Sequence, residues 1–295
     1  MEKQVPIDSS ARADQHTEDG LHDLTSDVAY QRHMIVNVVF YGMRDLKEWI
    51  LIDTGIKGSS SAIQASAAKR FGKDTPPLAI ILTHGHTDHV GSLTDLLEKW
   101  DVPVYAHPLE FPYLDGRSPY PPPDTSVSSG MMAKTSPMLG RGPIDVSRWL
   151  KPLPEDGSVP GMPEWRWIHT PGHTPGHVSL WRQTDATMIA GDAFVTTAQE
   201  SIYAVMTQRE EVHGPPQYFT TDWIAAKESV RQLAALGPEI VITGHGHALR
   251  GEKMRHALDR LARDFDRVAV PEKGRYVNEP ARADASGVTY IPPDL

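Results

Sequence analysis

The sequence predicts an α/β fold, in which strand-length apolar runs alternate with helical segments. The run from Leu78 to Thr83 is followed by an apolar-periodic segment from Val90 to Trp100, and the run from Glu239 to Thr243 is followed by a helical segment from about Glu252 to Val268. The chain has 295 residues, of which 39% are apolar, and this is enough for a substantial core. Histidines follow both strand-like runs, and they are the first candidates for a functional site.

The junction between the first of these strands and its helix reads HGHTDH. His84 and His86 alternate along an extended turn and can reach one metal ion together, and Gly85 lets the backbone turn tightly between them. Asp88 and His89, where the helix begins, point elsewhere and can serve a second ion. A single histidine after a strand is more often packed or exposed than a ligand, but three histidines and one aspartate this close together favour a metal site.

Three later segments add candidate ligands, each at or near the end of a predicted strand. The motif TPGHTPGH contains His173 and His177, and its Pro-Gly turns hold the loop rigidly, as a metal ligand requires. His173 is the favoured ligand, and His177 is expected to make structural hydrogen bonds. Asp192 follows the short run MIA, and His245 follows the run EIVIT.

The other elements are predicted from periodicity and capping residues. Met34 to Tyr41 and Trp49 to Ile52 are strand-like, and helices are predicted over Ser59 to Phe71 and over Asp222 to Leu236, where Asp222 can act as the N-cap. Asp53 directly follows the second of these strands. Its side chain either caps a turn or orients a metal ligand from behind, and the sequence leaves both roles open.

Composition excludes several classes of site and partner. The chain has no cysteine, so disulfides, thiolate metal ligands and a cysteine nucleophile are excluded, and histidines with carboxylates remain as the strong ligands. The net charge of −9 gives no electrostatic footprint for nucleic acid or an anionic membrane. The N-terminus lacks the apolar stretch of a signal peptide, so a cytoplasmic location is expected.

A single large domain is predicted over residues 26–272, between a polar N-terminal tail of residues 1–25 and an extended C-terminal tail of residues 273–295. The segment 114–161 is rich in proline and glycine and is interpreted as a lid-like insertion, with a distant variable insertion as the alternative. His107 follows a short predicted strand and is not assigned to metal. Apolar residues that a plain linker would not need support the lid: Met131, Met132, Met138, Leu139 and Trp149.

The full set of candidate ligands resembles that of the metallo-β-lactamase superfamily, over a region from about Met34 to Arg267. The set is His84, His86, Asp88, His89, His173, Asp192 and His245. The resemblance implies an αβ/βα four-layer sandwich of two mixed sheets with helices outside. It further implies that His84, His86 and His173 hold one metal, that Asp88, His89 and His245 hold a second, and that Asp192 bridges both.

A dinuclear metal-dependent hydrolase follows from this resemblance and from the ligand chemistry. Imidazoles and carboxylates without thiolates suit two zinc ions, with manganese or iron as substitutes. A hydroxide shared by two ions is a nucleophile at neutral pH, and Asp88 is expected to be the catalytic proton acceptor as well as a ligand. The expected substrate is a small ester, lactone or thioester, and a homodimer is compatible with the sequence. The alternatives are a mononuclear iron oxygenase of the persulfide dioxygenase kind and a phosphodiesterase.

Departures from the patterns of particular branches narrow the substrate further. Zinc β-lactamases lack the bridging carboxylate that Asp192 supplies. Hydroxyacylglutathione hydrolases match the ligands but carry a basic C-terminal helical region, for which little chain remains after His256. Quorum-quenching lactonases share TPGHTPGH but place a catalytic tyrosine where this chain has Val195, so Tyr203 or Tyr218 would have to substitute. Activated aryl esters and some lactones are therefore the expected substrates, ahead of hydroxyacylglutathione and β-lactams.

Overall fold

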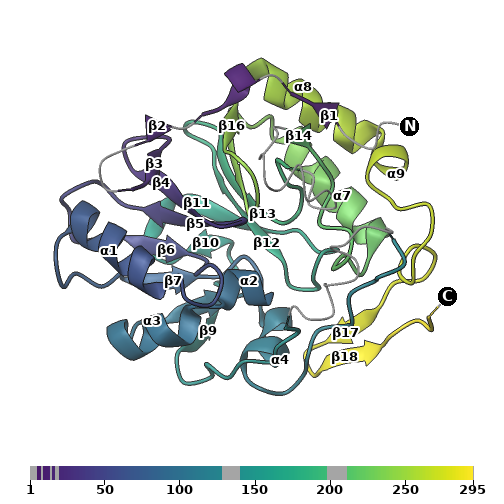
Figure 1. The fold of residues 1–295 in the computed structure, drawn as a ribbon, viewed down its shortest axis with the longest axis horizontal. Coiled ribbons are helices and arrows are strands. Elements are labelled where there is room, and N and C mark those ends of the chain that lie inside the picture. Colours follow the sequence, from purple (N-terminus) through teal and green to yellow (C-terminus); the bar gives the residue numbers. More distant parts are fainter. Residues whose placement is uncertain are drawn as a thin grey trace.

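Two β-sheets lie face to face at the centre of the computed structural model (Figure 1). The first sheet has eight strands in the order β2-β3-β4-β5-β6-β7-β8-β9, and the second has six in the order β10-β11-β12-β13-β15-β16. Both sheets mix parallel and antiparallel neighbours. The structure describes residues 5–7, 9–13, 15–16, 20–127, 140–197 and 211–294.

The first sheet is antiparallel from β2 to β6 and parallel from β6 to β9. Its central strands are short and apolar, as expected for strands that are covered on both faces. The strands are β2 (Gln15–His16), β3 (His22–Asp23), β4 (Val28–His33), β5 (Val36–Tyr41), β6 (Ile50–Ile52), β7 (Ala79–Ile81), β8 (Val104–Ala106) and β9 (Leu150–Pro152).

The second sheet is antiparallel except where β13 and β15 run parallel. Its strands are β10 (Ser158–Val159), β11 (Met162–His169), β12 (Val178–Arg182), β13 (Thr187–Gly191), β15 (Ile240–Thr243) and β16 (Leu249–Arg250). Two small sheets pair β1 (Val5–Pro6) with β14 (Glu211–Val212) and β17 (Arg282–Asp284) with β18 (Gly287–Tyr290).

Helices cover the outer faces of both sheets (Figure 1). Those on the side of the first sheet are α1 (Ser60–Phe71), α2 (Thr87–Val90), α3 (Leu93–Trp100) and α4 (Phe111–Leu114), which follows the short 3-10 helix η2 (Pro108–Glu110). Those on the side of the second sheet are α7 (Trp223–Ala235), α8 (Gly251–Arg263) and α9 (Phe265–Val268), and the 3-10 helix η1 (Ser9–Ala11) lies beside α8. None of the helices among the described residues has the length and apolar character needed to cross a bilayer.

Three buried apolar clusters fill the three interfaces between the four layers. Ile52 of the first sheet and Trp165 of the second belong to the cluster between the sheets. Leu97 of α3 belongs to a second cluster, under the helices of the first sheet. Val230 of α7 and Leu258 of α8 belong to a third, under the helices of the second sheet. The predicted αβ/βα four-layer sandwich is therefore confirmed, and each cluster stabilises one interface between layers by removing apolar surface from water.

Most predicted elements are present, with informative differences at their ends. The predicted N-cap of α7 is confirmed, because the Asp222 carboxylate accepts hydrogen bonds from the N–H groups of Ile224 and Ala225 at 3.0 and 2.9 Å. The helix predicted over residues 90–100 is divided into α2 and α3. The break lies at Gly91 and Ser92: the N–H of Gly91 donates to the carbonyl of Gly55 at 2.8 Å, and Ser92 leaves the helical conformation with a φ of −106° and a ψ of 8°.

The N-terminal segment differs from the expected polar tail of residues 1–25. Its described residues form β1, which pairs with β14, and β2 and β3, which extend the first sheet. Leu21 and Ala11 are buried. A strand of two residues is too short to show an apolar periodicity in the sequence. Backbone hydrogen bonds to neighbouring strands hold such a strand in place.

The C-terminal segment also differs from the expected extended tail of residues 273–295, since β17 and β18 form a hairpin. Arg117 donates a hydrogen bond to the carbonyl of Ala285 at 3.0 Å, and the N–H of Val288 donates to Ser118 Oγ at 3.3 Å. These contacts attach the hairpin to the chain that follows α4.

The insertion predicted over residues 114–161 is only partly separate from the sheets. Its last part supplies β9 to the first sheet and β10 to the second, because the backbone there continues the strand pairing of both sheets. Trp149 packs against the core under the helices of the first sheet. Four of the apolar residues that favoured a lid lie outside the described residues: Met131, Met132, Met138 and Leu139.

Candidate metal centre

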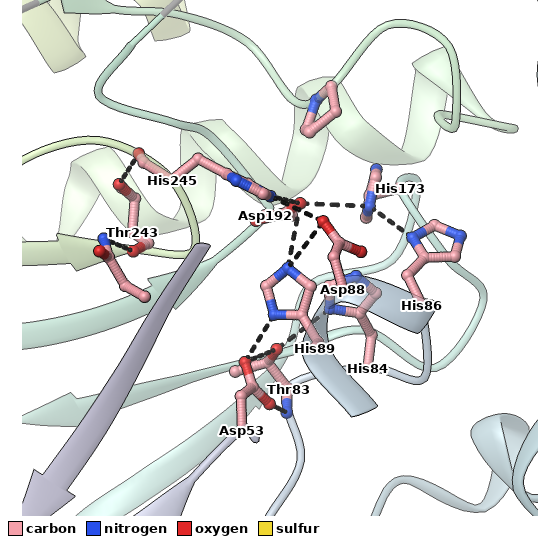
Figure 2. Close-up of polar contacts among 12 residues, drawn as sticks. Asp53, Thr83, His84, His86, Asp88, His89, His173, Asp192, Thr243 and His245 are labelled. Carbon is pink, nitrogen blue, oxygen red and sulfur yellow. Dashed lines mark hydrogen bonds and ion pairs between the residues drawn. The ribbon is translucent and has the colours of Figure 1, made fainter. Parts of the chain in front are cut away.

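The seven candidate ligands meet at one edge of the sandwich, where strands of both sheets end (Figure 2). His84 and the three candidates that follow it in HGHTDH come from the end of β7 and from α2. His173 comes from the loop between β11 and β12, Asp192 from the end of β13, and His245 from the end of β15. Residues more than 150 positions apart in the sequence are thus brought together by the two sheets.

The first ligand group consists of His84, His86 and His173. One nitrogen of each ring lies within 4.8 Å of one nitrogen of the others. His86 Nδ1 and His173 Nε2 are 2.9 Å apart. His84 and His173 are buried. Three imidazoles in this arrangement could bind one divalent cation.

The second ligand group consists of Asp88, His89 and His245, whose ligand atoms also lie within 4.8 Å of one another. His245 Nε2 is 3.3 Å from Asp88 Oδ2, and His89 Nε2 is 3.9 Å from the same oxygen. Two imidazoles and one carboxylate could bind a second cation.

Asp192 lies between the two groups (Figure 2). Its Oδ2 atom is 3.5 Å from His173 Nε2 in the first group. The same oxygen is 3.6 Å from His89 Nε2 and 3.2 Å from His245 Nε2 in the second group. A carboxylate in this position faces both groups at once.

Several buried polar atoms at this centre have no hydrogen-bond partner among the described residues. They are His84 Nε2, His89 Nε2 and Asp192 Oδ1. An unpaired buried polar atom costs free energy, so a cluster of three calls for an explanation. Lone pairs on neutral imidazoles and on a carboxylate are the donors that a divalent cation accepts, and these residues therefore fit a metal centre.

A glycine closes the wall of this centre on the side of β15. A Cβ atom on Gly244 would lie 2.0 Å from Asp192 Oδ1 and 2.7 Å from His89 Cε1. Because a side chain at this position would displace both ligands, glycine is required before His245.

Burial and neighbouring charges set the protonation of the first ligand group. Burial, with the nearby histidines, holds the pKa values of His84 and His173 well below the ordinary value of 6.5. Burial also lowers the pKa of His86 to about 4. All three imidazoles are therefore neutral at pH 7, which is the form that binds a metal.

The second ligand group has the opposite electrostatic character in the chain without metal. Burial opposes the charge on Asp192, but His245 and His89 outweigh it and hold the pKa of Asp192 well below its ordinary value. Burial likewise opposes the charge on His245, while Asp192 outweighs it and raises the pKa of His245 to about 9. A cation bound here would take the place of these protons next to the carboxylates.

Hydrogen bonds from behind hold three of the imidazoles in one orientation. His89 Nδ1 is 2.8 Å from Asp53 Oδ2, and His245 Nδ1 is 2.7 Å from the carbonyl of Ile35. His84 Nδ1 is 3.0 Å from Thr83 Oγ1. In each case Nδ1 is occupied and Nε2 is turned toward the centre.

The structure decides between the two roles that the sequence leaves open for Asp53. Its carboxylate accepts hydrogen bonds from the N–H and hydroxyl of Thr83 at 2.8 and 2.7 Å, and it contacts the ring of His89. Asp53 therefore orients a candidate ligand from behind. It does so with a φ of 58°, a left-handed conformation that aspartate tolerates better than most residues.

The two histidines of TPGHTPGH have different surroundings, and His177 makes the structural hydrogen bonds expected of it. His177 belongs to neither group, and its Nε2 accepts a hydrogen bond from the N–H of Asp192 at 2.9 Å. Its Nδ1 lies 2.8 Å from Thr170 Oγ1. His177 is fully buried and supports the backbone that carries Asp192. His107 is also outside both groups, and its ring stacks on that of His169 with centroids 4.3 Å apart.

Comparison with known proteins places this geometry in a family. A sequence profile of the Metallo-beta-lactamase superfamily matches residues 32–245. The chain belongs to the metallo-beta-lactamase superfamily. A relative from Bacillus subtilis (strain 168), named "Probable metallo-hydrolase YflN", is 46% identical over 244 residues, which cover 82% of this chain and 90% of the relative. "Probable metallo-hydrolase YybB" from the same organism is 30% identical over 70% of this chain and 80% of its own length.

Solved structures agree with this superfamily at the level of the fold. A "Beta-lactamase domain protein from Burkholderia ambifaria" has a TM-score of 0.59 at 18% identity, and the match covers 90% of this chain and 81% of that protein. The "BLEG-1 B3 metallo-beta-lactamase" has a TM-score of 0.50 at 23% identity, over 87% of this chain and 98% of that protein. At such identities the likeness shows the metallo-beta-lactamase fold and not a substrate.

A cavity of about 90 Å³ opens beside the first ligand group of this superfamily member. Asp88 and His86 line it, together with Arg141, the sole arginine or lysine among the described residues of its wall. The remaining lining residues come mainly from apolar or aromatic types: Ile35, Ile56, Thr87, Tyr120, Pro121, Gly140 and Phe219. The predicted lid segment therefore contributes to the wall of the cavity.

Sequence reasoning missed several residues around the centre, among them Glu110, Tyr120 and Phe219. The ring of Tyr120 lies against His86, with centroids 4.5 Å apart. The ring of Phe219 lies near the same imidazole, with centroids 5.4 Å apart. These residues carry no motif and are distant in sequence from the histidine cluster, so only the fold reveals their position.

Proposed function

We propose that the protein is a dinuclear metal-dependent hydrolase of small esters, lactones or thioesters. The observation that carries this proposal is the position of Asp192, whose Oδ2 atom lies 3.2 to 3.6 Å from histidines of both ligand groups. A carboxylate that faces two groups of metal-binding side chains suits two cations better than one.

In this proposal the first ligand group holds one ion, the second ligand group holds the other, and Asp192 contacts both. The donors are imidazoles and carboxylates, and the chain has no cysteine. This donor set favours zinc, with manganese or iron as substitutes. When bound, such ions lower the pKa of a water molecule and polarise the carbonyl oxygen of a substrate.

Asp88 is the proposed catalytic proton acceptor. Its side chain is 32% exposed and lines the cavity, whereas the side chain of Asp192 is 2% exposed. Burial opposes the charge on Asp88, but the nearby His89 and His245 outweigh it and lower the pKa of Asp88, so its carboxylate is ionised at neutral pH, as a metal ligand must be.

The walls of the cavity favour a small acyl compound. Ile35, Ile56 and Phe219 supply apolar surface, and Arg141 supplies one positive charge. The Arg141 side chain makes no hydrogen bond or ion pair within the described part of the chain. We therefore extend the proposal to substrates with an anionic group, such as a carboxylate, beside an apolar portion.

Leaving-group chemistry orders the substrates further. Val195 is fully buried at the position where the lactonase pattern has tyrosine, and Tyr218 is buried outside the residues that line the cavity. Tyr203 lies outside the described residues. Without a hydroxyl at Val195 to protonate an alkoxide, substrates with good leaving groups need the least help. The proposal favours activated aryl esters and some lactones over hydroxyacylglutathione and β-lactams.

A substrate panel with metal analysis tests the proposal. The purified chain is analysed for bound metals and assayed on aryl esters, lactones, thioesters including hydroxyacylglutathione, phosphodiesters and β-lactams. Two divalent ions per chain with turnover of esters or lactones would support it. One iron per chain with oxygen consumption would favour the oxygenase alternative, and preferred turnover of phosphodiesters would favour the phosphodiesterase.

A further inference from the structure

One buried carboxylate outside both ligand groups joins the two loops that carry the first group. Glu110 is fully buried and accepts four hydrogen bonds, two on each oxygen. We propose that Glu110 is a positioning residue that holds the loop of His84 and His86 in register with the loop of His173. The inference rests on the proposed metal centre and concerns how that centre is assembled.

The first oxygen of Glu110 holds the HGH turn. Oε2 accepts a hydrogen bond from the N–H of Gly85 at 2.9 Å, and Gly85 is the residue between His84 and His86. Oε2 also accepts the hydroxyl hydrogen of Tyr120, whose ring lies against His86. The N–H of Gly85 reaches the Tyr120 hydroxyl oxygen as well, at 2.9 Å.

The second oxygen holds the TPGHTPGH loop. Oε1 accepts hydrogen bonds from the N–H of Gly176 at 2.7 Å and from the hydroxyl of Thr174 at 2.9 Å. Thr174 directly follows His173, so the carboxylate acts one residue away from a ligand on this side too. The same carboxylate therefore sets the separation of the two loops. At this separation His86 Nδ1 of one loop lies 2.9 Å from His173 Nε2 of the other.

Close packing leaves little room for another arrangement. A Cβ atom on Gly176 would lie 2.8 Å from both the nitrogen and Cγ of Glu110, and a Cβ atom on Gly85 would lie 2.7 Å from the Tyr120 hydroxyl oxygen. Both loops approach this site through glycine backbone. If the carboxylate were removed, the buried N–H of Gly176 would lose its acceptor, and the N–H of Gly85 would keep only the Tyr120 hydroxyl oxygen.

Glu110 is itself held by the start of the segment that follows β8. The N–H of Glu110 donates to the carbonyl of His107 at 2.9 Å, and His107 Nδ1 accepts a hydrogen bond from Leu109 at 3.2 Å as the cap of η2. The backbone of Glu110 is therefore fixed in a capped turn, and this limits how far the carboxylate can move with the two loops.

The second ligand group gives an internal comparison. His89 is oriented by Asp53, and His245 by the carbonyl of Ile35, without a contact to Glu110. Loss of the Glu110 carboxylate should therefore weaken the first ligand group selectively. A purely structural role would affect both groups through overall stability alone.

Zinc titration of the metal-free protein tests this selectivity. Glu110→Gln preserves the size of the side chain but replaces one acceptor oxygen by an amide that donates. We expect competition with a chromophoric chelator to show one zinc site weakened about 10- to 100-fold and the other unchanged. In the metal-free chain, the ¹⁵N resonances of the His86 and His173 rings should shift, while those of His89 and His245 should not.

Two further variants separate positioning from general destabilisation. Tyr120→Phe removes one of the four donors and should give a smaller effect in the same direction. Arg182→Gln breaks the ion pairs of a buried arginine to Asp27 and Asp185 away from the centre, so it should lower stability without changing zinc affinity.

The outcomes distinguish this inference from the proposed function. Native affinities at both sites in Glu110→Gln, or an equal loss at both sites that Arg182→Gln reproduces, would overturn the role of Glu110 while leaving a hydrolase intact. Failure of the unaltered chain to bind zinc, manganese or iron would overturn the metal centre itself and this inference with it.

Discussion

The imidazole of His89 is bound through Nδ1 to Oδ2 of Asp53, 2.8 Å away, and both side chains are buried. The other oxygen of Asp53 accepts the N–H of Thr83, so the carboxylate cannot turn away from the ring. This contact places a hydrogen on Nδ1, so Nε2 is the nitrogen that faces the candidate metal centre.

Asp53→Asn should therefore weaken zinc binding by about 10- to 100-fold although it preserves size and shape. An amide nitrogen in place of Oδ2 donates to Nδ1 and transfers the ring hydrogen to Nε2, where it blocks a cation. The affinity is measured by chelator competition, with Asp185→Asn as a control for the same substitution away from the centre. Native zinc affinity in Asp53→Asn would show that the tautomer of His89 does not matter.

Asp192→Ala should lower the metal content and abolish hydrolysis without unfolding the chain. The reason is that Asp192 Oδ2 faces His173 of the first ligand group and His245 of the second. Metal content is measured after dialysis in a defined zinc buffer, and the fold is checked by circular dichroism. Full activity of a metal-replete Asp192→Ala protein would remove Asp192 from the centre.

His177→Ala should have the opposite effects: it should lower the stability of the fold and cause little loss of metal. Its imidazole fills a buried site and accepts the N–H of Asp192, and removal leaves both a void and an unpaired amide. The expected loss is about 2–4 kcal/mol in the free energy of unfolding, measured by urea denaturation. His177→Gln offers a matched control, because its side-chain oxygen can still accept. Loss of a metal ion from His177→Ala would mean that the two histidines of the loop were assigned the wrong way round.

The sequence predicted the ligand loops well because the signal is local. HGHTDH places four candidate ligands within six positions, directly after a strand whose apolar run is unambiguous. Glu110 could not be found in this way, since its partners Gly85 and Gly176 lie 25 and 66 positions away and contribute backbone groups that have no sequence signature. The short strands β2 and β3 were missed for a related reason, because pairing with neighbours and not apolar alternation defines them.

The pH dependence of stability should report on His107, which belongs to neither ligand group. Burial, with a smaller contribution from the stacked His169, lowers the pKa of His107 from 6.5 to about 4. Above pH 6.5 the ring is neutral in both folded and unfolded chains. As the pH falls from 6.5 to 4, the unfolded chain gains a proton that the folded chain does not, so stability decreases, by at most about 3 kcal/mol and less for a partly exposed ring.

His107→Asn removes this titration but keeps an oxygen that can cap η2. The difference in unfolding free energy between His107→Asn and the unaltered chain should shift in favour of the variant as the pH falls from 7 to 4.5. Urea denaturation of the metal-free proteins measures it, and His256→Asn on the exposed face of α8 is the control. A pH-independent difference would show that His107 titrates normally in the folded chain.

If the proposed hydrolysis takes place, Arg141 should determine whether the protein prefers substrates with an anionic group. It is the one arginine or lysine among the described residues that line the cavity, next to the apolar surface of Ile35 and Phe219. A hydrogen bond to a charged group contributes about 1.5–3 kcal/mol, so Arg141→Ala should raise KM about 10- to 100-fold for an ester that carries a carboxylate. The neutral methyl ester of the same compound should be unaffected, and Arg141→Lys should recover part of the loss because it keeps the charge without the planar guanidinium. Equal changes in KM for the charged and neutral substrates would mean that Arg141 shapes the wall of the cavity but does not interact with the charge of the substrate.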